Sequence, residues 1–274
     1  MATPSFHSQI RERLVRDLQR PAADEAAQLK NGLRLLGKWR SQLVQNTLIQ
    51  REGTRVLQGP FAGMAFLARS AEGCHVPKLL GCYEQPLHAA IEAAIAANYA
   101  TVVNVGCAEG YYTVGMARRM PHARFLAFDI DENAQATCRQ LAEQNGVADR
   151  VQIGARFDPA GFAALPPGRT LVLCDIEGGE GELLDPALAP DLARMDLIVE
   201  SHDCLSPGMT ARLVERFRPT HDIAMIPDDG LRRLDPLPRW FSELDHMDQL
   251  LATWEWRSGP TPWLVMKARS APAA

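Results

Sequence analysis

Seven short apolar segments between residues 101 and 268 dominate the hydrophobic pattern of the chain. The first five are separated by segments with helical spacing, and they lack a strict alternation of apolar and polar residues. Strands of a parallel sheet covered by helices on both faces have this pattern. The pattern therefore predicts an α/β fold with a Rossmann-like, seven-stranded and mostly parallel sheet. The predicted strands are residues 101–105, 123–128, 150–154, 170–174, 196–199, 222–226 and 262–268.

The N-terminal segment has a different pattern, with leucines recurring at helical spacing. Residues 8–20 and 22–50 are predicted to form two amphipathic helices that are broken at Pro21. Gly53 is expected to end the second helix. The sequence therefore predicts a helical extension before the sheet.

Between the extension and the first strand, residues 54–69 are predicted to form a β-hairpin and residues 83–98 a helix. Both segments precede the alternation of strands and helices, so they are expected to lead into the core. The expected divisions are an N-terminal helical extension (1–58), the hairpin and helix (59–99) and a cofactor-binding domain (100–270).

Composition and charge narrow the function classes. The 274 residues are 46% hydrophobic, with a net charge of −4, which argues against nucleic acid as the main partner. Residues 1–58 nevertheless contain ten Lys/Arg against five Asp/Glu, which suits either a solvated helical face or a lid or homodimerisation segment. No apolar run is long enough for a membrane span, and the N-terminus is polar, so we expect a cytoplasmic protein.

A glycine-containing loop after the first predicted strand is the strongest sign of a ligand site. Gly106 and Gly110 occur in VVNVGCAEGYYTVGMA, where a strand runs into a helix that is expected to begin near Tyr111. Glycine permits a sharp turn and a close approach of the backbone to a ligand. Their spacing differs from the G-x-G-x-x-G dinucleotide fingerprint and favours a nucleoside that carries an amino acid. Asn104 and Cys107 of the same stretch complete the expected loop.

Acids after the next two strands extend this cofactor site. Asp129 follows the second strand, where an acid can accept hydrogen bonds from both ribose hydroxyls. Asp131 and Glu132 are interpreted as the N-cap and first-turn acid of the next helix. Asp158, after the third strand, is a candidate contact for the adenine amino group, although loop aspartates are common.

The fourth and fifth strands end in a second group of polar residues. Asp175 and Glu200 follow these strands, and His202 comes two residues later. Because the carboxyl ends of parallel strands share one edge, we expect these side chains to meet beside the ligand. An acid there can balance positive charge, and His202 can act as a general base. Alternatively, Asp175, Glu200 and Asp203 can bind Mg²⁺ through oxygen ligands.

The segments GPFAGM, PKLLGCYE, VVNVGCAEGYYTVGMA, FDID, DIEGGE and ESHD together resemble the FkbM-like branch of class I S-adenosylmethionine (SAM)-dependent methyltransferases. The resemblance covers about residues 59–230, and DIEGGE is its most specific motif. It implies a seven-stranded methyltransferase sheet, SAM contacts by Gly106, Gly110 and Asp129, and a role for Asp175. Asn104 departs from the family, which usually has an acid at that position.

The resemblance implies O-methylation of a small molecule, such as a natural product or sugar. Tyr83, Glu84 and Tyr111 are candidate substrate contacts, because they are expected to line the pocket from the side opposite the acids that follow the fourth and fifth strands. The tyrosine rings can also attract the sulfonium of SAM. One alternative is cyclisation of SAM to a small cyclic amino acid with release of methylthioadenosine. Another is a nucleic-acid methyltransferase or a non-catalytic SAM-binding protein that uses the basic helices.

Overall fold

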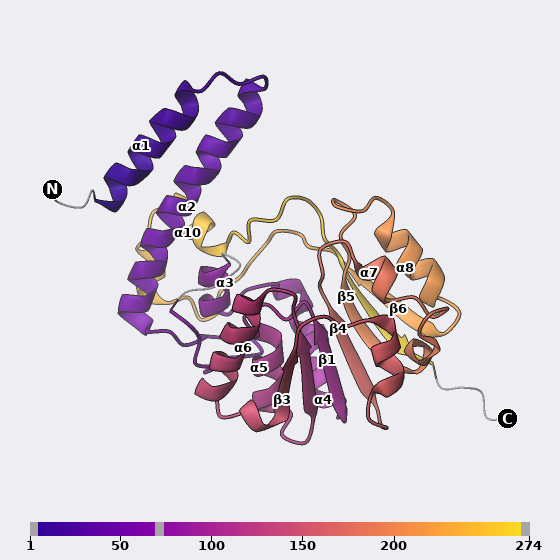
Figure 1. Ribbon diagram of the computed structural model, residues 1–274. Coiled ribbons are helices and arrows are strands. Elements are labelled where there is room, and N and C mark those ends of the chain that lie inside the picture. The colour runs from indigo at the N-terminus through magenta and orange to yellow at the C-terminus, as the bar shows by residue number, and fades with distance from the viewer. Residues whose placement is uncertain (1–4, 69–73, 270–274) are drawn as a thin grey trace. The chain divides into compact units, whose positions relative to one another are not determined.

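The computed structural model describes residues 5–68 and 74–269 (Figure 1). Contacts divide these residues into two compact units. The first comprises the described part of Met1–Gly53 together with Pro236–Trp254, and the second comprises that of Thr54–Asp235 together with Glu255–Ala274. The first boundary thus falls at Gly53, and a segment late in the chain joins the N-terminal helices. No described helix is both long enough and apolar enough to span a membrane.

The second unit contains the sheet, and all seven predicted strands are confirmed. Their order is β3-β2-β1-β4-β5-β7-β6. The strands β1 to β5 pair with one another in parallel, whereas β7 is antiparallel to both β5 and β6. The strands are β1 (Thr101–Val105), β2 (Arg124–Phe128), β3 (Val151–Gly154), β4 (Thr170–Cys174), β5 (Asp196–Glu200), β6 (His221–Ile226) and β7 (Trp263–Ala268).

The centre of the sheet is covered on both faces. Every residue of β1, β4 and β5 is buried, although successive side chains of a strand point to opposite faces. This burial explains why the central strands are continuous apolar runs. The helices of this unit are α3 (His75–Leu80), α4 (His88–Ala96), α5 (Tyr111–Arg119), α6 (Glu132–Gln144), α7 (Glu180–Leu183) and α8 (Met209–Phe217), with 3₁₀ turns at Gln85–Leu87, Ala148–Arg150, Pro159–Ala164 and Pro190–Arg194.

Two pairs of these helices lie along the sheet, α5 with α6 and α7 with α8 (Figure 1). α5 and α6 contact each other beside β2 and β3, whereas α7 and α8 contact each other beside the half that contains β6. Asp131 caps α6 through a bond from the Asn133 N–H (2.9 Å), as its sequence position indicates. Gly146 has φ +66° just beyond the end of α6, a left-handed conformation that glycine commonly adopts after a helix.

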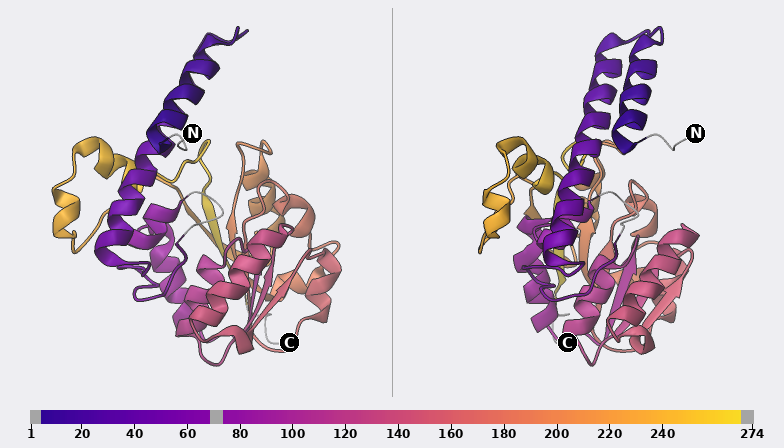
Figure 2. Two further views of the ribbon diagram at one scale, coloured as in Figure 1. Left: turned by 60° about the vertical axis from the view of Figure 1, so that its left-hand side comes forward. Right: turned by 90° about the vertical axis from the view of Figure 1, so that its left-hand side faces the viewer.

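The first unit is helical, with α1 (Phe6–Gln19) and α2 (Glu25–Glu52) side by side (Figure 2) and with α9 (Arg239–Ser242) and α10 (His246–Thr253). The break at Pro21 and the end of α2 at Gly53 are confirmed. Asp24 caps α2 by accepting from the Ala27 N–H (3.0 Å). α10 contacts α2, and this contact explains why residues 236–254 belong with the N-terminal helices.

Two local predictions differ from the structure. The predicted hairpin contains no regular strand, but its arms do pair: Arg55 and Ala65 form an isolated antiparallel bridge, the Val56 N–H donates to the Met64 carbonyl (2.9 Å), and the Phe66 N–H donates to the Thr54 carbonyl (2.6 Å). The predicted helix over residues 83–98 is regular only in α4, because a 3₁₀ turn that contains Pro86 precedes it.

Candidate functional site

The loop between β1 and α5 packs tightly against neighbouring residues at two glycines. Gly106 has φ +80°, and a Cβ there would lie 1.6 Å from the Asp175 carbonyl oxygen. Gly110 has φ +92°, and its Cβ would lie 2.6 Å from the Cys138 Sγ. Both the left-handed backbone and the lack of space require glycine at these positions. The turn therefore has the tight geometry that the glycine spacing predicts.

Asp129 lies directly after β2 and binds this loop. One carboxylate oxygen accepts from the Ala108 N–H (2.8 Å), and the other accepts from the Asp131 N–H (2.9 Å). These bonds hold the carboxylate toward the glycine turn while each oxygen keeps further acceptor capacity. The structure thus brings together the acid and the loop from which a nucleoside site was expected.

A cavity of about 750 Å³ opens beside this turn at the carboxyl ends of the strands. Such a volume is typical of a small-molecule site. Every residue that lines it belongs to the second unit. Its wall includes Gly106, Asp129, Ile130, Phe157, Asp158 and Asp175.

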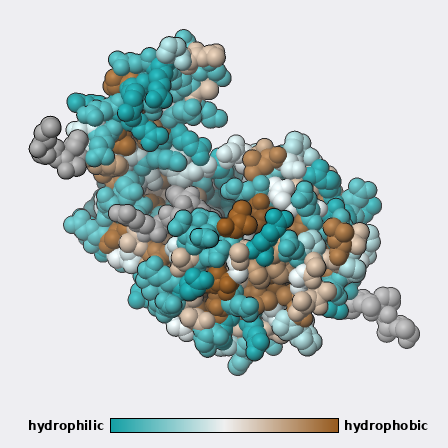
Figure 3. Space-filling model, viewed as in Figure 1, coloured by the Kyte–Doolittle hydropathy of each residue, from teal (hydrophilic) through white to brown (hydrophobic). Residues whose placement is uncertain are grey.

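Large apolar side chains form one side of this cavity. Ile130 is 82% exposed and comes directly after β2 and Asp129. The ring of Phe157 packs against those of Phe128 and Phe162 at centroid distances of 4.7 and 4.8 Å. Hydrophobic residues also gather in the middle of the molecular face in Figure 3. Ile130 and Phe157 were not predicted from the sequence, where the available signal was an apolar residue directly next to a candidate acid, Asp129 or Asp158.

Asp158 also lines the cavity, but Arg156 already binds its carboxylate. The Arg156 Nε lies 2.9 Å from the Asp158 Oδ1, and both side chains are well exposed. An exposed ion pair of this kind is weak. Asp158 is therefore available to a ligand only in competition with a neighbouring arginine.

Three other residues expected in the cofactor site, Asn104 in β1 and Cys107 and Gly110 in the loop itself, do not line this cavity. Asn104 is buried and donates to the Thr113 hydroxyl (2.9 Å). Cys107 is buried next to Cys138, and the neighbouring thiol and burial raise its pKa. Gly110 gives Cys138 the space that a side chain would occupy. These residues therefore support the conformation of the loop and do not face the cavity.

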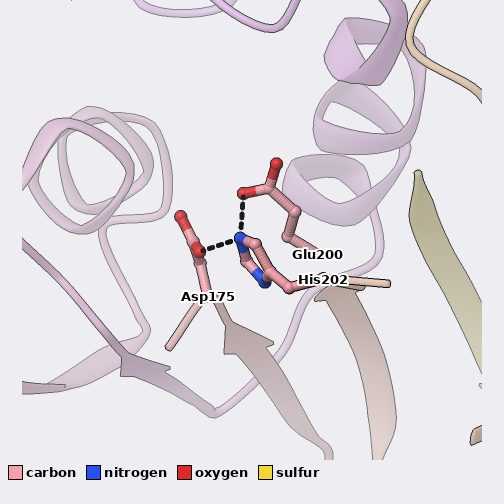
Figure 4. Close-up of side chains that lie close together, drawn as sticks. All are labelled: Asp175, Glu200 and His202. Carbon is pink, nitrogen blue, oxygen red and sulfur yellow. Dashed lines mark ion pairs between the residues drawn. The ribbon is translucent and has the colours of Figure 1, made fainter. Parts of the chain in front are cut away.

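At the ends of β4 and β5, Asp175, Glu200 and His202 meet (Figure 4). The His202 Nε2 lies 3.6 Å from the Asp175 Oδ1 and 3.8 Å from the Glu200 Oε2. The side chain of Asp175 is 31% exposed and lines the cavity, whereas His202 and Glu200 are buried. The expected convergence is therefore present, with Asp175 at the cavity wall and His202 behind it.

Glu180, the first residue of α7, binds the other imidazole nitrogen. Its Oε1 lies 2.7 Å from the His202 Nδ1, and this oxygen also accepts from the Gly178 N–H (3.1 Å). Burial alone would lower the pKa of His202, but the bond to Glu180 and then the charge of Glu200 outweigh burial, and the pKa is raised. Glu180 ends the DIEGGE motif, but its contact with His202 was not predicted from the sequence.

Of the three residues expected to bind Mg²⁺, only Asp175 and Glu200 lie close together. One ligand atom each from Asp175, Glu200 and His202 lies within 4.8 Å of the others. Asp203 instead accepts from the Thr210 backbone N–H (3.3 Å) and from its hydroxyl. Arg257 binds the second oxygen of Glu200. A histidine nitrogen and a carboxylate already paired with a guanidinium do not suit Mg²⁺, which prefers oxygen ligands.

Arg257 organises a buried ionic network next to this group. It donates to Glu200 and to the Glu84 Oε1 (2.7 Å), and its Nε also lies 2.7 Å from the Asp228 Oδ2. The second oxygen of Glu84 accepts from the Tyr112 hydroxyl. Burial and then the charge of Glu200 raise the pKa of Glu84 to about 8. Both carboxylate oxygens of Glu84, which was expected to contact the substrate, are thus bonded to other residues of the protein.

The other two expected substrate contacts, Tyr83 and Tyr111, belong to a buried aromatic cluster. Their rings meet edge to face at a centroid distance of 5.6 Å. The Lys78 Nζ lies over both rings, and it bonds Glu109 of the glycine loop at 2.6 Å. Neither tyrosine lines the described cavity. Lys78 and Glu109, which sequence reasoning missed, tie the loop to α3.

No family model matches the sequence. The release factor glutamine methyltransferase of Cereibacter sphaeroides is 32% identical over 135 residues, which cover 48% of this chain and 46% of that protein. The chain thus matches less than half of the length of this curated relative.

Solved structures with a similar fold include two methyltransferases. An O-methyltransferase of Bacillus cereus in complex with SAH is 14% identical, covering 68% of this chain and 81% of that chain, with a TM-score of 0.46. The O-methyltransferase of Streptomyces achromogenes involved in tomaymycin synthesis, in complex with SAM, is 11% identical, covering 84% and 90%, with a TM-score of 0.47. At such low identity, the chemistry of the site rests on its own residues.

Proposed function

We propose that this protein is a SAM-dependent methyltransferase. The observation that carries the proposal is the contact between Asp129 and the glycine turn at one wall of a cavity of about 750 Å³. A strand-end acid beside a glycine turn is the arrangement that binds a nucleoside in open α/β sheets. The partial alignment with a curated methyltransferase supports the proposal.

The cavity offers a separate partner for each part of SAM. The Asp129 carboxylate would accept hydrogen bonds from the ribose hydroxyls. Ile130 and Phe157 provide apolar contact for the adenine ring, and Asp158 lies at the same wall. Gly106 and Asp175 line the part of the wall where β1 and β4 end. The methionine portion would therefore lie toward Asp175.

Oxygen is the acceptor that this site favours. An acceptor hydroxyl beside Asp175 would lose its proton to the His202 Nε2 as its oxygen bonds to the methyl carbon. The methyl–sulfur bond breaks in the same step and leaves neutral S-adenosylhomocysteine. A positioned general base contributes about 10²–10⁴-fold to such a step. This step uses no Mg²⁺, because a histidine nitrogen and a carboxylate paired with a guanidinium do not suit that ion.

The finer assignment is an FkbM-like enzyme that methylates a small molecule, such as a natural product or sugar. DIEGGE supports it, because this motif supplies Asp175 at the cavity wall and Glu180 under the histidine. The alignment with release factor glutamine methyltransferase favours a protein side chain as a second candidate acceptor.

Product analysis tests the proposed function. Purified protein would be incubated with SAM and a panel of hydroxylated small molecules, and the adenosyl products identified by mass spectrometry. Acceptor-dependent S-adenosylhomocysteine is the expected product, and His202→Ala should lower its formation at least about 100-fold while SAM affinity changes less than about threefold. Methylthioadenosine from SAM alone would instead establish the cyclase alternative. Absence of SAM binding in calorimetry would reject both enzymes.

A further inference from the structure

A buried carboxylate lies directly behind the histidine of the candidate active site. Glu180 is 0% exposed, and its side chain bonds His202 and the Gly178 N–H through the same oxygen. Its other oxygen has no hydrogen-bond partner among the described residues. Burying a carboxylate in this way is costly unless a strong partner compensates for it. The imidazole of His202 is that partner.

The chemistry of this contact fixes the roles of the two imidazole nitrogens. An ionised carboxylate only accepts hydrogen bonds, so the Nδ1 of His202 must carry a proton and donate it to Glu180. In the neutral imidazole the lone pair is then on Nε2. That nitrogen faces Asp175 and Glu200 (Figure 4). The nitrogen nearer to the cavity wall is thus the one that can take a proton.

We propose that Glu180 is a positioning residue that holds His202 in the Nδ1–H tautomer, with Nε2 directed toward Asp175. The inference rests on the proposed methyl transfer. In that step the acceptor oxygen–hydrogen bond breaks and its proton moves to Nε2, while Nδ1 keeps its proton bonded to Glu180. The resulting imidazolium lies between the carboxylates of Glu180, Asp175 and Glu200.

Without Glu180, the histidine has a competing arrangement. A neutral imidazole with its proton on Nε2 could donate to Asp175 or Glu200, which lie 3.6 and 3.8 Å away. That tautomer places no lone pair toward the cavity wall and cannot accept the proton there. A side chain that accepts at Nδ1 selects against it, as an orienting acid does for other catalytic histidines.

Two substitutions of Glu180 separate positioning from a general structural role. Glu180→Gln keeps an oxygen that can accept from Nδ1, whereas Glu180→Ala removes the acceptor. We expect turnover to fall less than about tenfold in Glu180→Gln and at least about 100-fold in Glu180→Ala. SAM affinity should change less than about twofold in both. Glu215→Ala, an exposed acid on α8, is the matched control and should behave as the wild type.

Nitrogen NMR of labelled protein gives a readout that needs no turnover. Above the pKa of His202, the wild type and Glu180→Gln should carry the neutral proton on Nδ1, and Glu180→Ala should shift toward the Nε2–H tautomer. A wild-type imidazole with its proton on Nε2 would overturn the proposal. So would equal turnover in Glu180→Ala and the wild type. Because the tautomer is observed without SAM or acceptor, its failure is distinct from failure of the methyltransferase assignment.

Discussion

Asp129 binds the loop and faces the cavity with the same carboxylate. Its oxygens accept from the Ala108 and Asp131 N–H groups, so the acid is fixed before any ligand arrives. A pre-oriented acceptor loses little side-chain freedom on binding, and its bonds to ribose hydroxyls are charge-assisted. In the proposed site, recognition of the ribose would therefore depend mainly on Asp129.

We predict that Asp129→Ala weakens SAM binding about 100-fold, which corresponds to about 2.7 kcal/mol. Isothermal titration calorimetry measures this change directly. Asp149→Ala removes an exposed acid from the surface and should leave the affinity within about twofold. An affinity in Asp129→Ala that equals the wild-type value would remove the ribose assignment.

At the scale of elements, the junctions of β1 with α5 and of β4 with α7 form the site together. Gly106 lies against the backbone of Asp175, so the two strand ends meet without an intervening side chain. This contact places the glycine loop next to the segment that carries Asp175 and Glu180. The parallel pairing of β1 and β4 sets the register that makes the contact possible.

Substituting Gly106 should disrupt this junction. In Gly106→Ala the new Cβ would lie 1.6 Å from the Asp175 oxygen at φ +80°, so the backbone must shift and SAM binding should fall at least about tenfold. Gly146→Ala is a matched control, because φ is +66° there but nothing lies within 4 Å of the added Cβ. It should cost about 1–2 kcal/mol of stability and leave SAM affinity intact. Calorimetric titration and chemical denaturation separate the two outcomes.

At the scale of the whole molecule, the chain forms two units, and the segment 236–254 returns to the N-terminal helices. Arg40 on α2 binds Asp248 on α10 through two hydrogen bonds of 2.5 and 2.6 Å. Paired contacts of a guanidinium with a carboxylate are strong and directional. This ion pair therefore connects distant parts of the chain within the helical unit.

We predict that Asp248→Ala destabilises the helical unit by about 1–3 kcal/mol, since a nearly buried partner of Arg40 is lost. Circular dichroism during thermal unfolding should show an earlier loss of helix. SAM affinity should stay within about twofold, because the cavity is lined by the other unit. Asp17→Ala, at an exposed ion pair with Arg13, should change stability by less than about 0.5 kcal/mol. A large loss of SAM affinity in Asp248→Ala would contradict this separation.

The sequence by itself determined the seven strands, the two N-terminal helices and the positions of the glycine turn and Asp129. These features are encoded locally: buried strands need continuous apolar residues, and a left-handed turn needs glycine. The order of acids after the strands also indicated the edge of the sheet at which a site would form.

Only the tertiary structure decided which side chains meet. Glu180 contacts His202 across 22 positions, and Arg257 contacts Glu84 across 173, and no local pattern encodes either pairing. Packing likewise joined 236–254 to the N-terminal helices and kept Tyr83 and Tyr111 away from the described cavity wall. Burial, hydrogen-bond partners and charge environment are properties of neighbours in space. They are therefore fixed only when distant segments of the chain pack together.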